Sequence, residues 1–324
     1  VAAAGAAALR APSQLGDAAA AARLCGGQAA AEGEGRRAAY FWSKTNGDAA
    51  STGHSEHTAP ANISRGPSWT WKDETESLVF THPCIDAEKN LYLANRNGVV
   101  RKFKLSGETA WQNTDSFGGQ GSAVLAGNGA IMDGAIHVGF VDGSVAAIDM
   151  QTGQTRWKVR ASPSAGNDGW SILAHGGVVI AAGRSEGWAK SEQDFGGNDQ
   201  VVALDARDGR RLWTFRPPGL FLYGFLGSFA DGPPSVVFAD VLGVAYRLAL
   251  CDGRLLWRSG EGRGNATFSN GGAVVDPSGR RVFVTGNDVD PETKAVRGEL
   301  AAYDLGSGAR LWRHGAPLPA DAAP

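Results

Sequence analysis

Two groups of side chains in this 324-residue chain have types and spacings that could bind a metal ion. Asp288, Asp290 and Glu292 form an acidic run that resembles a calcium loop in charge, but it lacks the glycine and the spacing of a twelve-residue calcium loop. His54 and His57 form a His-x-x-His pattern, which can bring two imidazoles together, but no third ligand is evident. We therefore expect ordinary polar loops at both places.

Other catalytic patterns are missing from the sequence. It contains no Cys-x-x-Cys-His for haem, no Cys-x-x-Cys pair for zinc, no Gly-x-Ser-x-Gly and no Walker-type loop. Three cysteines leave at least one thiol unpaired, so disulfides are not the main framework. A net charge of −2 gives no footprint for nucleic acid, and no run of 18 apolar residues could span a membrane.

The elements that must position any site are indicated by a repeated phrase. Five times a glycine is followed four residues later by a tryptophan, at intervals of about 44 to 56 residues. The pairs are Gly107/Trp111, Gly153/Trp157, Gly209/Trp213, Gly253/Trp257 and Gly308/Trp312. Recurrence at this spacing predicts an array of structural repeats.

Each phrase predicts two strands joined by a tight turn. A short β-branched or aromatic run precedes the turn, as in residues 201–204, and the tryptophan lies on the returning strand. Asp149, Asp205 and Asp304 stand four residues before the glycine, where a carboxylate can accept a backbone N–H. The first copy lacks this aspartate, and the fourth has Ala249 instead. We expect all five tryptophans to pack between neighbouring repeats.

Two further strands precede each phrase, which makes four short antiparallel strands per repeat. The innermost one is the weakest in sequence, for example residues 171–174 and 223–227. Four such strands form the blade of a β-propeller. The sequence therefore predicts an all-β propeller over residues 74–316, with blades at about 74–113, 121–160, 166–216, 222–259 and 264–314.

The remaining segments lie outside these blades. Residues 1–39 are rich in alanine, and we expect low-complexity disorder there, with a remnant of a targeting segment as the alternative. Residues 40–73 are a lead-in that contains Ser68–Lys72 (SWTWK), a tryptophan strand without a blade of its own. Residues 317–324 form a tail.

The phrase VVALDARDGRRLW (Val201–Trp213) resembles the PQQ-type, or quinoprotein, propeller repeat. The resemblance covers residues 40 to 316 and implies seven or eight blades. Because only five blades and one strand are present, we expect an incomplete ring, either a fragment or a propeller that closes with a partner. A small ring of five or six blades is the alternative.

The resemblance also implies which residues would form a quinoprotein site. It places Glu186, in VVIAAGRSEG, and Asn287, in RVFVTGND, at the positions of ligands for Ca²⁺ and the quinone PQQ, and it places Asp321 near the position of the catalytic base. Three features count against such a site. A whole repeat separates the blades of Glu186 and Asn287, the vicinal cysteine pair of the alcohol dehydrogenases is missing, and Asp321 lies in a proline-rich tail.

We therefore predict a non-catalytic binding or scaffold propeller without a cofactor. Its protein or peptide partner would bind the loops at 184–199 and 286–298, because long loops on a rigid scaffold often carry function. One alternative is a PQQ- and Ca²⁺-dependent dehydrogenase, possibly truncated, that oxidises an alcohol or a sugar. Another is one domain of a longer enzyme. The resemblance makes an extracytoplasmic location possible.

Overall fold

A computed structural model describes residues 40–55, 62–74, 79, 81–116, 128–165, 172–188, 197–222, 225–260, 272–289, 292–293 and 296–317. Within them the only helical element is a single 3₁₀ turn, η1 (Ile63–Arg65), and no helix is long and apolar enough to cross a membrane. The strands form five sheets, each with four antiparallel strands. This confirms the all-β propeller fold.

The five sheets are the blades, here called blades 1 to 5 in chain order. Blade 1 contains β1 (Cys84–Ile85), β2 (Leu91–Ala94), β3 (Val100–Phe103) and β4 (Thr109–Asn113). Blade 2 contains β5 (Ala130–Met132), β6 (Ala135–Gly139), β7 (Ser144–Asp149) and β8 (Thr155–Arg160). Blade 3 contains β9 (Ile172–His175), β10 (Val178–Gly183), β11 (Gln200–Asp205) and β12 (Arg211–Phe215). Blade 4 contains β13 (Gly227–Ala230), β14 (Ser235–Ala239), β15 (Ala245–Ala249) and β16 (Leu255–Ser259). Blade 5 contains β17 (Ala273–Val275), β18 (Arg281–Val289), β19 (Val296–Asp304) and β20 (Arg310–Pro317).

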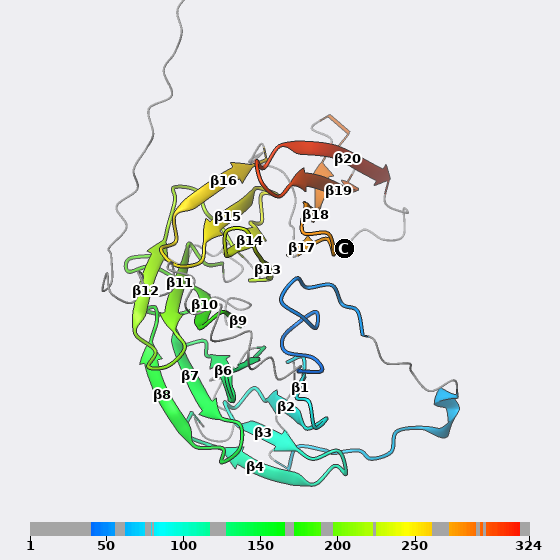
Figure 1. Cartoon of the computed structure of the whole chain (residues 1–324), viewed down its shortest axis with the longest axis vertical. Coiled ribbons are helices and arrows are strands. Elements are labelled where there is room, and N and C mark those ends of the chain that lie inside the picture. The colour runs from blue at the N-terminus through cyan, green and yellow to red at the C-terminus, as the bar shows by residue number, and fades with distance from the viewer. Residues whose placement is uncertain are drawn as a thin grey trace, which may run out of the picture.

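The blades lie side by side along an arc. The first strand of each blade faces the inside of the arc and the fourth faces the outside (Figure 1). One expected inner strand, residues 171–174, overlaps β9, whereas the other, 223–227, was placed too early because β13 begins at Gly227. Inner strands of three or four residues carry too short an apolar run to be located by pattern alone.

The hydrophobic core lies between neighbouring blades. One cluster of buried side chains joins blades 1 and 2, and others join blades 2 and 3, blades 3 and 4, and blades 4 and 5. The middle strands β6, β10, β11, β14 and β15 are buried along their whole length. Burial on both faces explains their valine- and alanine-rich composition, in which apolar residues run on without alternation.

A tryptophan ring lies against a glycine at each of these junctions. A Cβ atom added at Gly153, Gly209, Gly253 or Gly308 would lie 2.6 to 2.7 Å from the tryptophan ring of the preceding blade. These glycines also have positive φ values of 69° to 74°, which side chains disfavour. In each case the indole N–H donates to a carbonyl of the same turn, for example Trp157 Nε1 to Ala206 O at 2.9 Å. The glycine and the tryptophan of the phrase thus meet each other across blades.

The segment around Trp69 repeats this contact on blade 1. Its ring lies 2.7 Å from the Cβ position of Gly107, and its Nε1 donates to Leu105 O at 3.0 Å. Asp73 adds an ion pair to Arg101 at 3.2 Å. Residues 68–72, expected as a strand, have no strand assignment, yet Trp69 covers blade 1 as the tryptophan of a preceding blade would.

Candidate functional site

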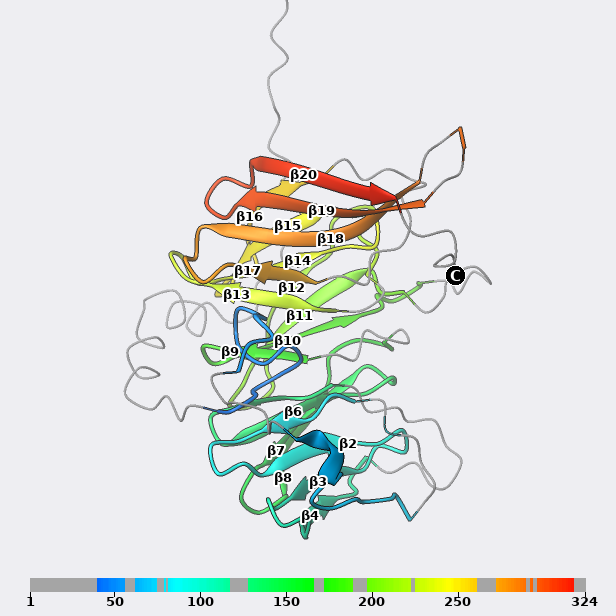
Figure 2. The ribbon, with the colours of Figure 1, turned by 90° about the vertical axis from the view of Figure 1, so that its right-hand side faces the viewer.

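The inside of the arc contains the chain's own residues 40–53. Trp42 pairs with Ile85 of β1, and Ser43 O accepts a hydrogen bond from Ile131 N of β5. Farther along, Ala49 O accepts from Phe229 N of β13, and Ala50 O accepts from Val275 N of β17. This axial segment therefore connects the inner strands of blades 1, 2, 4 and 5, and Figure 2, which looks into the open side of the arc, shows it between the blades.

Lys44 is the buried charge of the axial segment, with 2% of its surface exposed. Its Nζ donates to Ser51 Oγ at 2.5 Å, Thr45 O at 3.1 Å and Gly227 O at 3.4 Å. Burial disfavours the charged amine and lowers the pKa of Lys44 to about 8, although Asp48 and Cys84 oppose the change. The amine holds the segment to β13, on the far side of the arc from Trp42.

Cys84 lies on β1 next to this segment as a free, buried thiol. Its Sγ donates to Gly129 O at 3.2 Å, and burial raises the pKa of the thiol to about 12. Such a thiol stays protonated at neutral pH and is a poor nucleophile. Cys84 therefore acts as a core residue.

The residues that the resemblance assigned to a quinoprotein site are spread over different parts of the fold. Glu186 is exposed and follows β10 of blade 3. Asn287 lies half-buried on β18 of blade 5, opposite Gly298 of β19, so that blade 4 stands between the two residues. Asp321 lies outside the described residues.

The described residues do not fit a PQQ–Ca²⁺ site. No group of three or more His, Cys, Asp or Glu side chains converges in the part of the chain that the structure describes, and hard oxygen ligands are what Ca²⁺ requires. The buried charge inside the arc is the amine of Lys44, which repels a cation. The geometry therefore gives no support for a step through a quinone.

Two blades differ from the others on one face of the propeller. In blades 1, 2 and 4 the second and third strands are joined by tight turns that end at Gly98, Gly143 and Gly243. In blade 3 this connection is the loop at 184–199, part of which lies outside the described residues. In blade 5 it is the end of the long β18–β19 hairpin, which projects beyond the other strands in Figure 2. All these connections lie at the same end of their blades, so both candidate loops share a face.

The base of the blade 3 loop is firmly held. Asp199 accepts hydrogen bonds from Ser185 N at 2.7 Å and Ser185 Oγ at 2.6 Å, and it pairs with Arg216 Nε at 2.8 Å. Trp188 stacks on Phe221 with ring centroids 6.3 Å apart. The base thus joins blade 3 to the chain that leads into blade 4.

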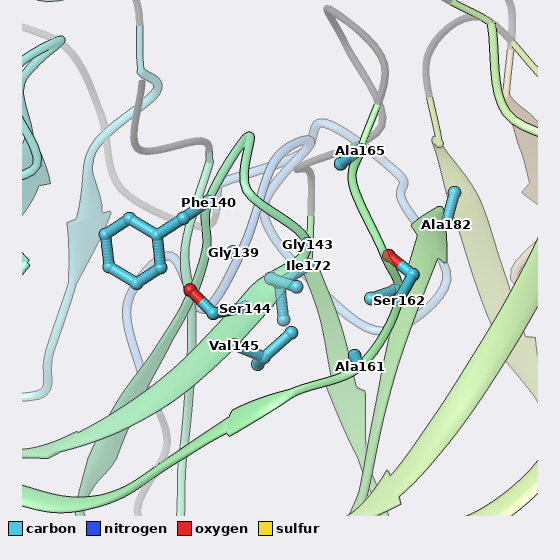
Figure 3. Close-up of a pocket in the computed structure, with 11 residues that line it drawn as sticks. Gly139, Phe140, Gly143, Ser144, Val145, Ala161, Ser162, Ala165, Ile172 and Ala182 are labelled. Carbon is cyan, nitrogen blue, oxygen red and sulfur yellow. The ribbon is translucent and has the colours of Figure 1, made fainter. Parts of the chain in front are cut away.

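A small pocket lies between blades 2 and 3, near the Gly143 turn (Figure 3). Glycine, alanine and serine side chains dominate its lining, with Ser144 and Ser162 as the polar groups. Its volume is about 10 Å³, room for roughly one water molecule. This hollow is far too small for an organic cofactor.

Comparison with known proteins places the fold in a family. The family model described as "Outer membrane protein assembly factor BamB" matches residues 68–186 and 141–323. The chain belongs to this family. The match covers the Trp69 segment and all five blades, which agrees with the PQQ-type repeat that the sequence indicated.

Individual relatives include a BamB and a dehydrogenase. The outer membrane protein assembly factor BamB of Bordetella pertussis is 27% identical over 256 residues, which are 75% of this chain and 57% of that protein. The quinohemoprotein alcohol dehydrogenase ADH-IIG of Pseudomonas putida is 28% identical over 160 residues, 46% of this chain and 21% of that protein. The chain thus spans about half or less of the length of these relatives.

A likeness to solved structures supports the fold alone. The quinohemoprotein alcohol dehydrogenase of Comamonas testosteroni has a TM-score of 0.57 and 16% identity, over 92% of this chain and 52% of that chain. At this identity the likeness says nothing about chemistry.

Sequence reasoning missed the residues that fill the inside of the arc. The lead-in at 40–55 was recognised as part of the resemblance, but nothing indicated that Lys44 and Ser51 would both meet Gly227 O. These contacts join residues more than 170 positions apart, so no local pattern reports them. A lysine flanked by aromatic and small residues, in YFWSKTNGDAAS, is the one local sign of a buried charge.

Proposed function

We propose that this chain is a non-catalytic binding or scaffold propeller of outer membrane protein assembly. The observation that carries the proposal is the pair of extended connections on one face, at 184–199 and at the tip of the β18–β19 hairpin. They flank the tight turn of blade 4 and stand on a base held by buried hydrogen bonds. A rigid scaffold with two raised loops is suited to bind a protein or a peptide.

The filled interior of the arc also favours this function. A quinoprotein needs space at the propeller axis for its cofactor, whereas here residues 40–53 bridge the inner strands of four blades. The family match adds the role, because the matching description names an assembly factor. We place the protein outside the cytoplasm, in keeping with that description and with Cys251, which is disulfide-bonded.

Shortening the blade 3 loop tests the proposal. Residues 189–196 are replaced by two glycines, so that Ser185, Asp199 and Arg216 keep the base intact. We expect the variant to lose about tenfold or more of its cross-linking to outer membrane assembly proteins in the producing cells, measured by quantitative mass spectrometry. Its thermal unfolding midpoint should stay unchanged.

The matched control alters the opposite face. Lys104→Ala with Glu108→Ala removes an exposed ion pair at the β3–β4 turn, where the atoms are 3.0 Å apart. This control should cross-link as the original chain does. Equal cross-linking by the shortened variant would refute the assignment of this face.

The dehydrogenase alternative has its own test. The purified chain is mixed with PQQ and Ca²⁺, and dye-linked oxidation of alcohols and sugars is measured. We expect no turnover. Turnover that is lost in Glu186→Gln would establish the alternative.

A further inference from the structure

The tryptophan–glycine contact recurs five times in the described residues, and each time it includes the same hydrogen bond. The tryptophans that make it are Trp69, Trp111, Trp157, Trp213 and Trp257, and their Nε1 atoms donate at 2.7 to 3.1 Å. The acceptors are turn carbonyls two or three residues before the glycine, for example Leu305 O before Gly308. This is a defined interface with a ring, a glycine and an acceptor.

Blade 5 carries a sixth tryptophan, which stands at the open end of the arc. Trp312 pairs with Ala302 across β19 and β20, as Trp257 pairs with Arg247 across β15 and β16. Yet Trp312 is 40% exposed, whereas Trp257 is buried under blade 5. The same element is thus covered in blade 4 and uncovered in blade 5.

The neighbours of Trp312 on the same face are apolar and exposed in the same way. Leu300 lies two residues before Ala302 and is 37% exposed, and Phe283 pairs with Ala302 and is half-buried. The corresponding residues of blade 4 are Ala245 and Val237, and both are fully buried against blade 5. We call Phe283, Leu300 and Trp312 the end face. Its side chains continue the series of inter-blade interfaces.

The geometry of that series specifies the occupant. A partner must offer a glycine at positive φ, where no Cβ blocks the ring, and a carbonyl within reach of Trp312 Nε1. The five turns of this kind in the described residues already lie under Trp69, Trp111, Trp157, Trp213 and Trp257. A second copy therefore offers no open turn unless it releases its own Trp69.

We propose that the end face is an interaction surface for a further propeller blade of the same repeat type, which binds Trp312 through its strand–Gly turn. The proposal does not depend on the role in outer membrane protein assembly, because it rests on the blade interfaces alone. A blade of this type would bury the three side chains of the end face together, as blade 5 buries Trp257.

The chain itself can supply the probe. In the double variant Trp69→Ala/Trp312→Ala, the Gly107 turn is uncovered and the end face is disabled, so this variant offers a turn but no ring. The original chain offers Trp312 but no open turn. Mixed together, the two should form a 1:1 complex in analytical ultracentrifugation, while each alone stays a monomer.

Two further variants make the readout specific. Adding Gly107→Val to the double variant should weaken the complex about tenfold or more, because the side chain would lie where the ring binds. Replacing the original chain by Trp312→Ala should weaken it equally. If Trp69→Ala prevents folding, as judged by circular dichroism, Trp69→Leu takes its place.

The outcomes separate the possible occupants. No complex between folded partners, or a complex that persists without Trp312, would overturn the proposal. Self-association of the original chain that is lost in Trp312→Ala would also overturn it, because a second copy would then be the occupant.

Discussion

Each glycine of the repeated phrase meets two separate demands. Its backbone has a positive φ, and a tryptophan ring fills the space where its Cβ would be. Gly153 meets both, at φ 74° and with the Trp111 ring 2.7 Å from the Cβ position. Gly243 meets only the first, at φ 76° with no atom within 4 Å. The two positions can therefore separate backbone strain from packing.

Gly153→Ala and Gly243→Ala test this separation. We expect Gly243→Ala to lower the free energy of unfolding by about 1–2 kcal/mol, the cost of the left-handed conformation. Gly153→Ala should cost about 1–3 kcal/mol more, because the methyl group collides with Trp111. Urea unfolding of the two variants measures both values. Equal losses would show that the ring contact contributes nothing.

Lys44 gives the stability a characteristic pH dependence. Its pKa is about 8 in the folded chain and 10.5 in the unfolded chain, so between these values the unfolded state binds more protons. Stability should therefore rise with pH from about 8 to 10.5, by about 3 kcal/mol from this residue. The Cys84 thiol acts in the opposite direction above about pH 9, because its pKa is raised.

The contribution of Lys44 is isolated by comparison with Lys44→Met. Subtracting the two stability profiles, measured by urea unfolding between pH 7 and 10.5, removes the part that Cys84 contributes to both. We expect the original chain to gain on the variant as the pH rises. A constant difference would mean that the amine is not buried in solution.

At the scale of the turn, an aspartate organises the link between the third and fourth strands. Asp149 accepts hydrogen bonds from Gln151 N at 2.9 Å and Thr152 N at 2.7 Å, and it pairs with Arg156 at 2.8 Å. The Thr152 N–H is the main reason why the pKa of Asp149 falls to about 2, with Arg156 next. Blade 4 keeps the same backbone turn with Ala249, so the carboxylate stabilises the turn without being required for it.

Asp149→Ala should therefore leave blade 2 folded and lower the free energy of unfolding by about 1–2 kcal/mol at pH 7. Because the folded pKa lies below the unfolded value of 3.8, this advantage should disappear as the pH falls from about 4 to 2. Acid titration of both chains by circular dichroism measures the difference. A gap that persists at pH 2 would point to a role other than the ionised carboxylate.

The elements were predictable to the extent that their signals are local. The phrases with Gly153 and Gly209 carry strand, turn and ring together, so they predict the outer strands of a blade directly. Inner strands such as β17, three residues long, carry no such signal. The contacts of Lys44 were not predictable, because they depend on the closeness of segments far apart in the chain.

For the whole molecule, the axial segment connects the two arms of the arc. Residues 40–53 bind blades 1 and 2 on one side and blades 4 and 5 on the other. Repeat proteins gain stability from each neighbour interface, and this segment adds contacts between blades that are not neighbours. It therefore couples the arms and limits how far the arc can open.

Truncation tests this coupling. A chain that begins at residue 54 should unfold in a broader, less cooperative transition and have a larger radius of gyration by X-ray scattering than a chain that begins at residue 40. The second chain is the matched control, since it keeps every contact of the axial segment. Identical scattering from the two chains would show that the blades alone hold the arc.

The central claim is that the face with the blade 3 and blade 5 loops binds a protein partner, and photo-crosslinking in the producing cells tests it most directly. A photoreactive amino acid is placed at exposed Glu186 on this face or at exposed Glu108 on the opposite face. We expect a discrete cross-linked product, containing an outer membrane assembly protein, from position 186 and none from position 108. Products from position 108 alone, or from neither position, would contradict the claim.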